Sequence, residues 1–285
     1  MQENGSHTLL VVLAHPDDES FGMGGTLARY ASEGVSVHLV CATRGEVGMV
    51  DPQLLQGFNS VAELRENELR CAASNLALAG VHFLDYRDSG MPGSPDNQHP
   101  QALAAQPVEQ VAEKIVHYMR SLRPQVVVTF DPIGGYKHPD HIAIHKATVL
   151  AFQQSGDPAC KDGQPPYQPT KLYFHVMSKR MLGLYVTFAR LIGQDPRHFG
   201  RNKDIDLQSL VQEGNFPIHA RINYQAVDRQ RAEAFACHVS QLPGGPPNRG
   251  PARWLNFLTG RSDTFMRAVP TAEPGLREKD LFAGL

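Results

Sequence analysis

The first 155 residues alternate between short apolar runs and longer stretches of helical periodicity, and this alternation limits the possible folds more than any other feature. The short runs predict buried strands at Leu9–Ala14, Val35–Ala42, Val81–Tyr86 and Gln125–Phe130. The stretches that follow predict helices at Gly24–Glu33, Val61–Ala79, Pro107–Leu122 and Pro139–Phe152. Repeated strand–helix units favour an α/β fold in which helices cover both faces of a mostly parallel sheet.

The second half of the chain is less regular. It predicts a strand at Lys171–Met177, helices at Arg180–Gly193 and Asp228–Val239, and a loop at Pro243–Pro251. We divide the chain into a core at residues 1–180 and a C-terminal subregion of the same domain at residues 181–285. Ligands of parallel sheets bind at the carboxyl ends of the strands, and we expect the C-terminal subregion to wall such a site.

Composition argues against several classes of function. The net charge of −2 gives no general attraction to nucleic acid or anionic lipid, and no apolar run approaches the ~20 residues of a membrane-spanning helix. The N-terminal residues do not resemble a secretory signal, so we expect a cytoplasmic protein. Four cysteines without a CxxC pair suggest neither a zinc knuckle nor a disulfide framework: Cys41, Cys71, Cys160 and Cys237.

One predicted helix carries a pronounced apolar face. This face favours packing on the core or against a second copy of the chain, and so a possible homo-oligomer, over membrane insertion. Its residues are Met181, Leu184, Tyr185, Phe188 and Ile192.

Two short segments carry most of the chemistry. The sequence AHPDDE at residues 14–19 follows the first predicted strand, and YKHPDH at residues 136–141 follows the fourth. Pro16 and Pro139 favour the start of a helix directly after each strand. Each segment therefore presents imidazoles and carboxylates at the edge where the strand ends converge.

These residue types are typical ligands of a divalent transition metal. A catalytic zinc ion takes three protein ligands and a water molecule, which His15, Asp18 and one of His138 or His141 would supply. Asp17 and the remaining histidine would flank the site as a base and an acid. Such a set predicts metal-assisted hydrolysis, because the ion lowers the pKa of water and a carboxylate accepts the proton.

Other interpretations compete with this one. Either motif alone is better explained as acidic residues at a helix N-terminus, where the helix dipole favours them. A metal- or ligand-binding module without turnover is a further alternative, although it would not need a spare base and acid. A dinucleotide site is weaker still, because Leu27 stands where the third glycine of GxGxxG belongs.

Together the motifs AHPDDE and HPDH resemble the LmbE-like/PIG-L family of metal-dependent N-deacetylases. This family includes deacetylases of the mycothiol and bacillithiol pathways, mycothiol-conjugate amidases and N-acetylglucosaminyl-phosphatidylinositol deacetylase. The resemblance covers Leu9–Phe152 and returns near Arg231–Gln241. It implies a Rossmann-like three-layer fold and zinc-dependent removal of the N-acetyl group from an N-acetylglucosamine-type substrate, a small amino sugar.

The resemblance also assigns roles to the two motifs. It implies that His15, Asp18 and His141 bind the metal, that Asp17 is the general base, and that His138 stabilises the oxyanion or protonates the leaving amine. The ligand set suits Zn²⁺ and also accepts Fe²⁺.

Two further residues of the second motif receive supporting roles from the same resemblance. Asp140 would orient a histidine ligand, and Tyr136 would polarise the scissile carbonyl.

Three residues outside the motifs are candidate substrate contacts by the same resemblance. Arg65 belongs to an RxxE pair with Glu68, although such a pair is also common on helix surfaces. Asp88 lies in RDSGM at residues 87–91 and would bind sugar hydroxyls, and His238 lies in an AxHxSQ segment and would help to close the site. A buried core histidine is the alternative for His238. RDSGM also permits an amidase that cleaves a thiol–amino-sugar conjugate.

Overall fold

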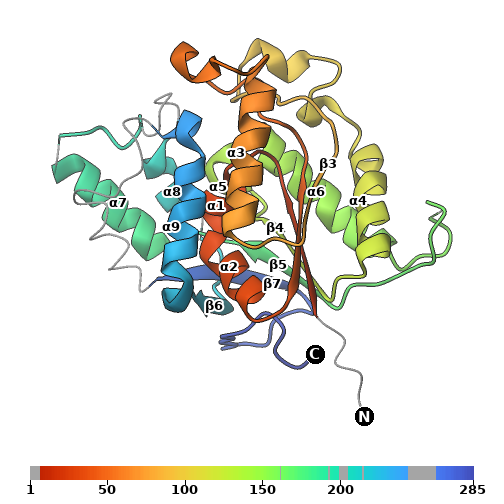
Figure 1. Ribbon diagram of the computed structural model, residues 1–285. Coiled ribbons are helices and arrows are strands. Elements are labelled where there is room, and N and C mark those ends of the chain that lie inside the picture. The colour runs from red at the N-terminus through yellow and green to blue at the C-terminus, as the bar shows by residue number, and fades with distance from the viewer. Residues whose placement is uncertain (1–6, 161, 192, 199–204, 214, 243–260) are drawn as a thin grey trace.

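A single mixed β-sheet forms the centre of the protein (Figure 1). The computed structural model describes residues 7–160, 162–191, 193–198, 205–213, 215–242 and 261–285. Within these residues the strands pair in the order β3-β2-β1-β4-β5-β7-β6. The first five run parallel, whereas β7 is antiparallel to both of its neighbours. The strands are β1 (Thr8–Leu13), β2 (Ser36–Cys41), β3 (Gly80–Phe83), β4 (Val126–Phe130), β5 (Lys171–His175), β6 (Ala220–Asn223) and β7 (Ser262–Val269).

Helices cover both faces of the sheet. On one face α4 (Val108–Leu122) packs against α6 (Pro139–Gln154), and on the other α9 (Asp228–Cys237) packs against α2 (Gly24–Ser32) and α3 (Val61–Asn75). This arrangement confirms the predicted three-layer α/β fold. The shorter or more peripheral helices are α1 (Asp18–Gly22), α5 (Gly134–Lys137), α7 (Lys179–Leu191) and α8 (Leu207–Glu213).

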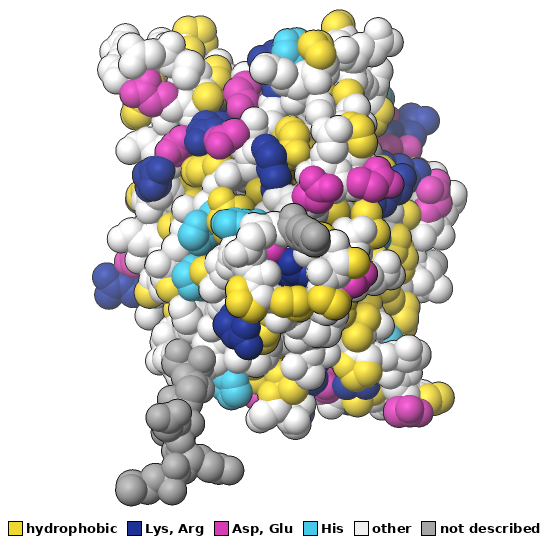
Figure 2. Space-filling model, turned by 90° about the vertical axis from the view of Figure 1, so that its right-hand side faces the viewer, with side chains coloured by type: hydrophobic (Ala, Val, Ile, Leu, Met, Phe, Trp, Pro, Cys, Tyr) yellow, Lys and Arg dark blue, Asp and Glu magenta, His cyan; other side chains and the backbone are white. Residues whose placement is uncertain are grey.

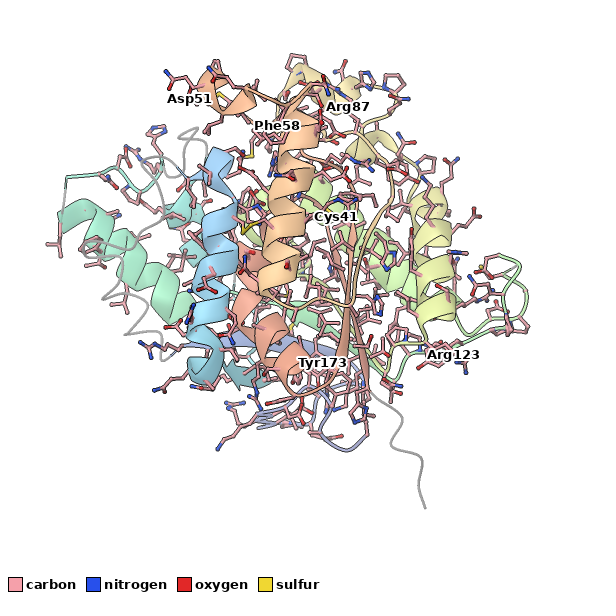
Figure 3. The ribbon with its side chains drawn as sticks, in the orientation of Figure 1. Cys41, Asp51, Phe58, Arg87, Arg123 and Tyr173 are labelled. Atoms are coloured by element: carbon pink, nitrogen blue, oxygen red, sulfur yellow. A yellow bond between two sulfur atoms is a disulfide. The ribbon has the colours of Figure 1, made fainter. Side chains whose placement is uncertain are left out.

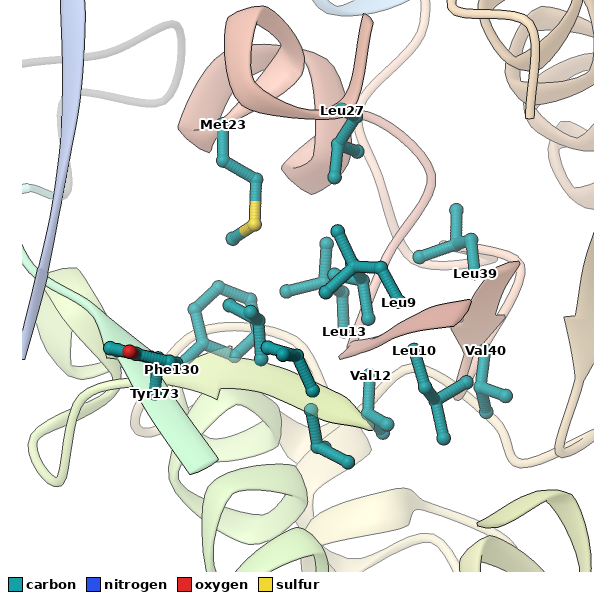
Figure 4. Packing of buried hydrophobic residues seen from close by; sticks show 14 of the residues in the cluster. Leu9, Leu10, Val12, Leu13, Met23, Leu27, Leu39, Val40, Phe130 and Tyr173 are labelled. Carbon is teal, nitrogen blue, oxygen red and sulfur yellow. The ribbon is translucent and has the colours of Figure 1, made fainter. Parts of the chain in front are cut away.

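The central position of β1 in the sheet explains why its sequence is continuously apolar. Leu9 and Leu13 point toward Met23 and Leu27 beside α2, whereas Leu10 and its alternate neighbours point to the opposite face (Figure 4). Every residue from Leu9 to Leu13 has no exposed surface. A strand buried on both faces needs apolar side chains at every position, and a strand with one wet face would alternate.

The C-terminal residues add elements that the sequence analysis did not predict. Strands β6 and β7 extend the sheet beyond β5, and helix α8 packs against α7. The alternating burial of β6, a short edge strand, gives little signal in four residues. The loop predicted at Pro243–Pro251 lies outside the described residues.

The buried face of α7 differs from the predicted apolar face. Leu182 and Val186 are buried against Leu210 of α8, whereas Leu184 is exposed. Both faces have helical spacing, so the contact with α8 decides which one is buried. Among the other predicted positions Phe188 is half-buried, and the side chains of Met181, Tyr185 and Ile192 are outside the described ones.

A disulfide joins the two helices α3 and α9 (Figure 3). Cys71 and Cys237 have their Cα atoms 5.8 Å apart and are separated by 166 residues in the sequence. The expectation that the cysteines form no disulfide is therefore wrong for this pair. No local spacing reveals it, because the packing of α3 on α9 alone brings the two residues together.

The described surface agrees with the balanced composition. On the face shown in Figure 2, acidic and basic side chains are interspersed and no large region of one sign forms. Among the described helices, none has both the length and the apolar character needed to cross a bilayer.

Candidate active site

The two sequence motifs meet at the carboxyl ends of β1 and β4. These strands are neighbours at the centre of the sheet, where the strand order reverses direction, and α/β sheets commonly bind ligands at such a point. His15 follows β1, while His138 and His141 stand at the start of α6. The ring centre of His15 lies 4.5 Å from that of His138 and 5.2 Å from that of His141. All three rings are buried.

The start of α6 fixes the two histidines that it carries. Pro139 occupies the first turn, and His138 caps the helix because its Nδ1 accepts the Asp140 N–H at 3.2 Å. The preceding loop approaches closely at Gly134, which has a φ of +67°. A Cβ atom there would lie 2.8 Å from the Cβ of His141, so only glycine allows this approach.

Three ligand-type side chains, those of His15, Asp18 and His141, lie close together. His15 Nδ1 lies 3.2 Å from His141 Nε2, and Asp18 approaches both rings, with Oδ2 3.6 Å from His15 Nδ1 and Oδ1 3.3 Å from His141 Nε2. Metal–ligand bonds of about 2.0–2.2 Å in tetrahedral geometry place ligand atoms roughly 3.3–3.6 Å apart. The donor set therefore fits a small divalent ion.

The histidine cluster also includes His138. Ligand atoms of His15, His138 and His141 all lie within 4.8 Å of one another, so a set of three histidines is a second candidate for the metal. His138 Nδ1 already accepts the backbone N–H of Asp140, which leaves only Nε2 for another contact. His141 has the shorter approach to Asp18, and this favours the set that the resemblance implied.

Two carboxylates lie behind His15 and set the orientation of its ring. Its Nε2 lies 3.1 Å from Asp140 Oδ2 and 3.5 Å from Asp88 Oδ1. A proton held on Nε2 by Asp140 leaves Nδ1 for the metal, the common carboxylate–histidine–metal arrangement. Burial lowers the pKa of His15, but Asp88 and Asp140 outweigh it and raise the pKa well above its ordinary value. A bound ion would replace the proton on Nδ1.

Asp17 faces the site in an unusual backbone conformation. Its φ of 118° lies in a region that residues other than glycine rarely adopt. Its Oδ2 accepts Arg65 Nη2 at 3.0 Å, and Arg65 also donates to the carbonyls of Pro16 and Gly45. Burial raises the pKa of Asp17 to about 6, against the opposite effect of Arg65. A carboxylate with a pKa near the working pH is suited to accept and return a proton.

His138 and Tyr136 lie beside His141 and offer hydrogen-bond donors. Burial and the charges of His15 and His141 lower the pKa of His138, so its ring is neutral with the proton on Nε2. The Tyr136 ring lies 4.9 Å from that of His141. Burial and the carboxylates of Asp18 and Asp17 raise the pKa of the Tyr136 phenol, so its hydroxyl keeps its proton.

The three residues predicted to contact substrate are all buried, but each has different neighbours. Arg65 does not form the surface ion pair with Glu68, since Glu68 instead accepts Ser240 from the segment after α9. Asp88 lies against His15. His238 is fully buried with its Nε2 2.7 Å from Glu19 Oε1, which favours the alternative of a buried histidine with a partner.

A small cavity lies beside Tyr136. It has a volume of about 200 Å³, and its lining includes Met91, Lys137 and, from α8, Leu210. The sequence analysis expected residues 181–285 to wall the site, but it did not predict α8, which contributes Leu210 here. It also missed the contact of Glu19 with His238, although Glu19 lies within the AHPDDE motif.

The fold and the site together define the class of protein: an α/β protein with a buried histidine–aspartate cluster suited to metal-dependent hydrolysis. The family described as PIG-L: GlcNAc-PI de-N-acetylase matches residues 10–152, which include both motifs. The chain belongs to this family. The protein is therefore an amide-bond hydrolase, as the family resemblance implied.

Known relatives agree with this assignment, and a solved structure shares the fold. The 1D-myo-inositol 2-acetamido-2-deoxy-alpha-D-glucopyranoside deacetylase of Streptomyces griseus is 35% identical over 100% of this chain and 91% of its own length. The deacetylase of the same name from Thermobifida fusca is 42% identical, over 82% of this chain and 83% of its own. The N,N'-diacetylchitobiose deacetylase of Pyrococcus horikoshii shares the fold, with a TM-score of 0.63 and 20% identity over 92% of this chain and 84% of its own.

Proposed function

We propose that the protein is a zinc-dependent deacetylase that releases acetate from an N-acetylglucosamine unit joined to inositol. The convergence of His15 Nδ1, the Asp18 carboxylate and His141 Nε2 carries this proposal, because two imidazole nitrogens and a carboxylate are donors that suit zinc. The names of the relatives support the inositol glycoside as substrate. The cavity beside Tyr136 offers room next to the site for the group attached to the amino sugar.

The side chains around the metal ligands divide the chemistry among them. When bound, a zinc ion would lower the pKa of water and polarise the amide carbonyl. Asp17 accepts a proton from the water that attacks the carbonyl carbon, and Arg65 keeps its carboxylate in place. His138 Nε2–H donates to the carbonyl oxygen as negative charge develops there. Tyr136 lies on the same side and adds a second donor.

Collapse of the tetrahedral intermediate breaks the carbon–nitrogen bond. The amine must gain a proton as it leaves, and Asp17, which took one from water, is the group placed to supply it, because the neutral ring of His138 can only donate a hydrogen bond. Asp140 holds His15 throughout by its contact with Nε2. Contacts of Arg65 with the substrate and of Asp88 with sugar hydroxyls stay predictions.

Acetate release by the metal-loaded protein tests the proposal. The panel contains free N-acetylglucosamine, its inositol glycoside, N,N'-diacetylchitobiose and a thiol–amino-sugar conjugate, assayed after chelation and after addition of Zn²⁺ or Fe²⁺. We expect turnover of the inositol glycoside that chelation abolishes and metal restores, and the more active ion identifies the resident metal. Cleavage of a thiol–amino-sugar conjugate without acetate release would instead establish the amidase. Absence of metal binding would refute the site itself.

A further inference from the structure

Asp17 stands at the N-cap of α1 without capping the helix. An aspartate at this position normally accepts a backbone N–H of the first turn, yet its side chain makes no such bond here. Its positive φ is accompanied by a contact between its carboxylate and Arg65 instead. Something other than local preference must hold this conformation, since an aspartate rarely adopts it.

Glu19 instead contacts the backbone of Asp17. Its Oε2 accepts the backbone N–H of Asp17 at 3.0 Å, across the first turn of the helix. Its Oε1 accepts the Ser20 hydroxyl at 2.6 Å and lies 2.7 Å from His238 Nε2. Glu19 has no exposed surface, so these contacts are shielded from water. The Glu19 carboxylate thereby joins the Asp17 backbone to His238, which lies 219 residues after Glu19 in the sequence.

The segment that carries His238 is itself fixed to α3. On one side, Cys237 is bonded to Cys71. On the other, Ser240 donates both its N–H and its hydroxyl to Glu68, each at 2.7 Å. The helix α3 also carries Arg65, which holds the Asp17 carboxylate. The backbone of Asp17, through Glu19 and His238, and its carboxylate, through Arg65, are therefore both anchored to α3.

We infer that Glu19 and His238 are positioning residues for Asp17. Glu19 holds the Asp17 N–H, and His238 fixes Glu19 in the orientation that does so. The Asp17 carboxylate is then free of the helix terminus and stays turned toward Arg65 and the metal ligands. This inference rests on the proposed function for the role of Asp17 as general base. The backbone conformation of Asp17 can, however, be determined without measuring turnover.

Paired substitutions separate positioning from a general role in stability. Glu19→Met removes the acceptor at similar size, whereas Glu19→Gln retains an oxygen for the Asp17 N–H. We expect Glu19→Met to lower kcat by about 10²-fold with KM within about threefold and metal content unchanged, as for a misplaced catalytic group. Glu19→Gln should stay within about fivefold of the wild type. His238→Leu and His238→Gln form a second pair with the same expected order.

Tyr30→Phe is the matched control, because it removes a buried hydroxyl that bonds Asp280 and Leu281 far from the strand ends. It should leave kcat unchanged. Equal losses of kcat in the Met and Gln variants, or a loss confined to metal content, would overturn the inference. If Glu19→Met does not fold, the His238 pair decides the question by the same criteria.

Crystal structures of the metal-free variants give a readout that does not depend on activity. We expect Asp17 to leave its positive φ in Glu19→Met and to keep it in Glu19→Gln. An unchanged Asp17 in Glu19→Met would overturn the inference, whatever the kinetics. If the wild type shows no deacetylase activity while Asp17 moves as expected, the proposed function fails and the positioning role stands.

Discussion

Asp140→Asn tests how much the carboxylate behind His15 contributes to metal affinity. Asp140 is fully buried, and its Oδ2 accepts the Ser89 N–H at 2.9 Å and faces His15 Nε2 at 3.1 Å. Its Oδ1 accepts the Ser89 hydroxyl. An asparagine can place its oxygen at the Oδ2 position and donate its amide to Ser89 Oγ, since a hydroxyl can accept two hydrogen bonds. The substitution therefore removes the charge and leaves the geometry in place.

The expected loss of metal affinity follows from removing the charge of Asp140 while its geometry is kept. Loss of an outer carboxylate behind a metal-binding histidine typically weakens metal binding by 10–100-fold, or about 1.4–2.7 kcal/mol. We expect the zinc dissociation constant of Asp140→Asn to rise within this range, because the neutral amide makes His15 Nδ1 a poorer donor. Competition with a chromophoric chelator at fixed pH measures it.

Ser89→Ala is the control for this experiment. It removes one hydrogen bond to Asp140 and leaves the charge that faces His15, so its dissociation constant should change by less than about threefold. Wild-type affinity in Asp140→Asn would refute the reasoning. An equal loss in Ser89→Ala would show that the position of the carboxylate matters and its charge does not.

Three further predictions follow from other parts of the structure. Asp17→Asn should lower kcat by at least ~10²-fold with metal retained, and full activity would disprove the assignment of the base. Burial raises the pKa of Asp263 to about 6, so this group stabilises the fold below about pH 4 and loses that contribution as the pH rises through 6. Relative to Asp263→Asn, the wild-type free energy of unfolding should fall by about 2.4 kcal/mol between pH 4 and 7, and a constant difference in denaturant titrations would contradict this. Replacement of Cys71 and Cys237 by serine should lower the free energy of unfolding by about 2–4 kcal/mol, which unfolding curves with and without reductant would check.

Sequence patterns predicted the elements that carry the site and missed those that complete it. The strand and helix around each motif are local signals, so β1 and α6 were placed within two residues of their observed starts. Which of His138 and His141 lies nearer to Asp18 depends on how α6 sits on the sheet, and residue spacing alone left this open. Likewise, the bond between Cys71 and Cys237 depends on the packing of α3 against α9. The buried face of α7 was unpredictable because its partner α8 was not recognised.

The sequence AHPDDE identifies the site correctly, but it does not show that its three consecutive carboxylates have different roles. Burial raises the pKa of each, but the neighbours differ: Arg65 only partly offsets the effect at Asp17, which has a pKa of about 6. At Asp18 and Glu19 the histidines outweigh burial, and the pKa of each is lowered. Environments that separate the pKa values of adjacent carboxyls separate their chemical roles. A helix start alone would turn all three acids toward the same backbone amides. Here each acid has a different side-chain partner: Asp17 binds Arg65, Asp18 approaches His15 and His141, and Glu19 contacts His238.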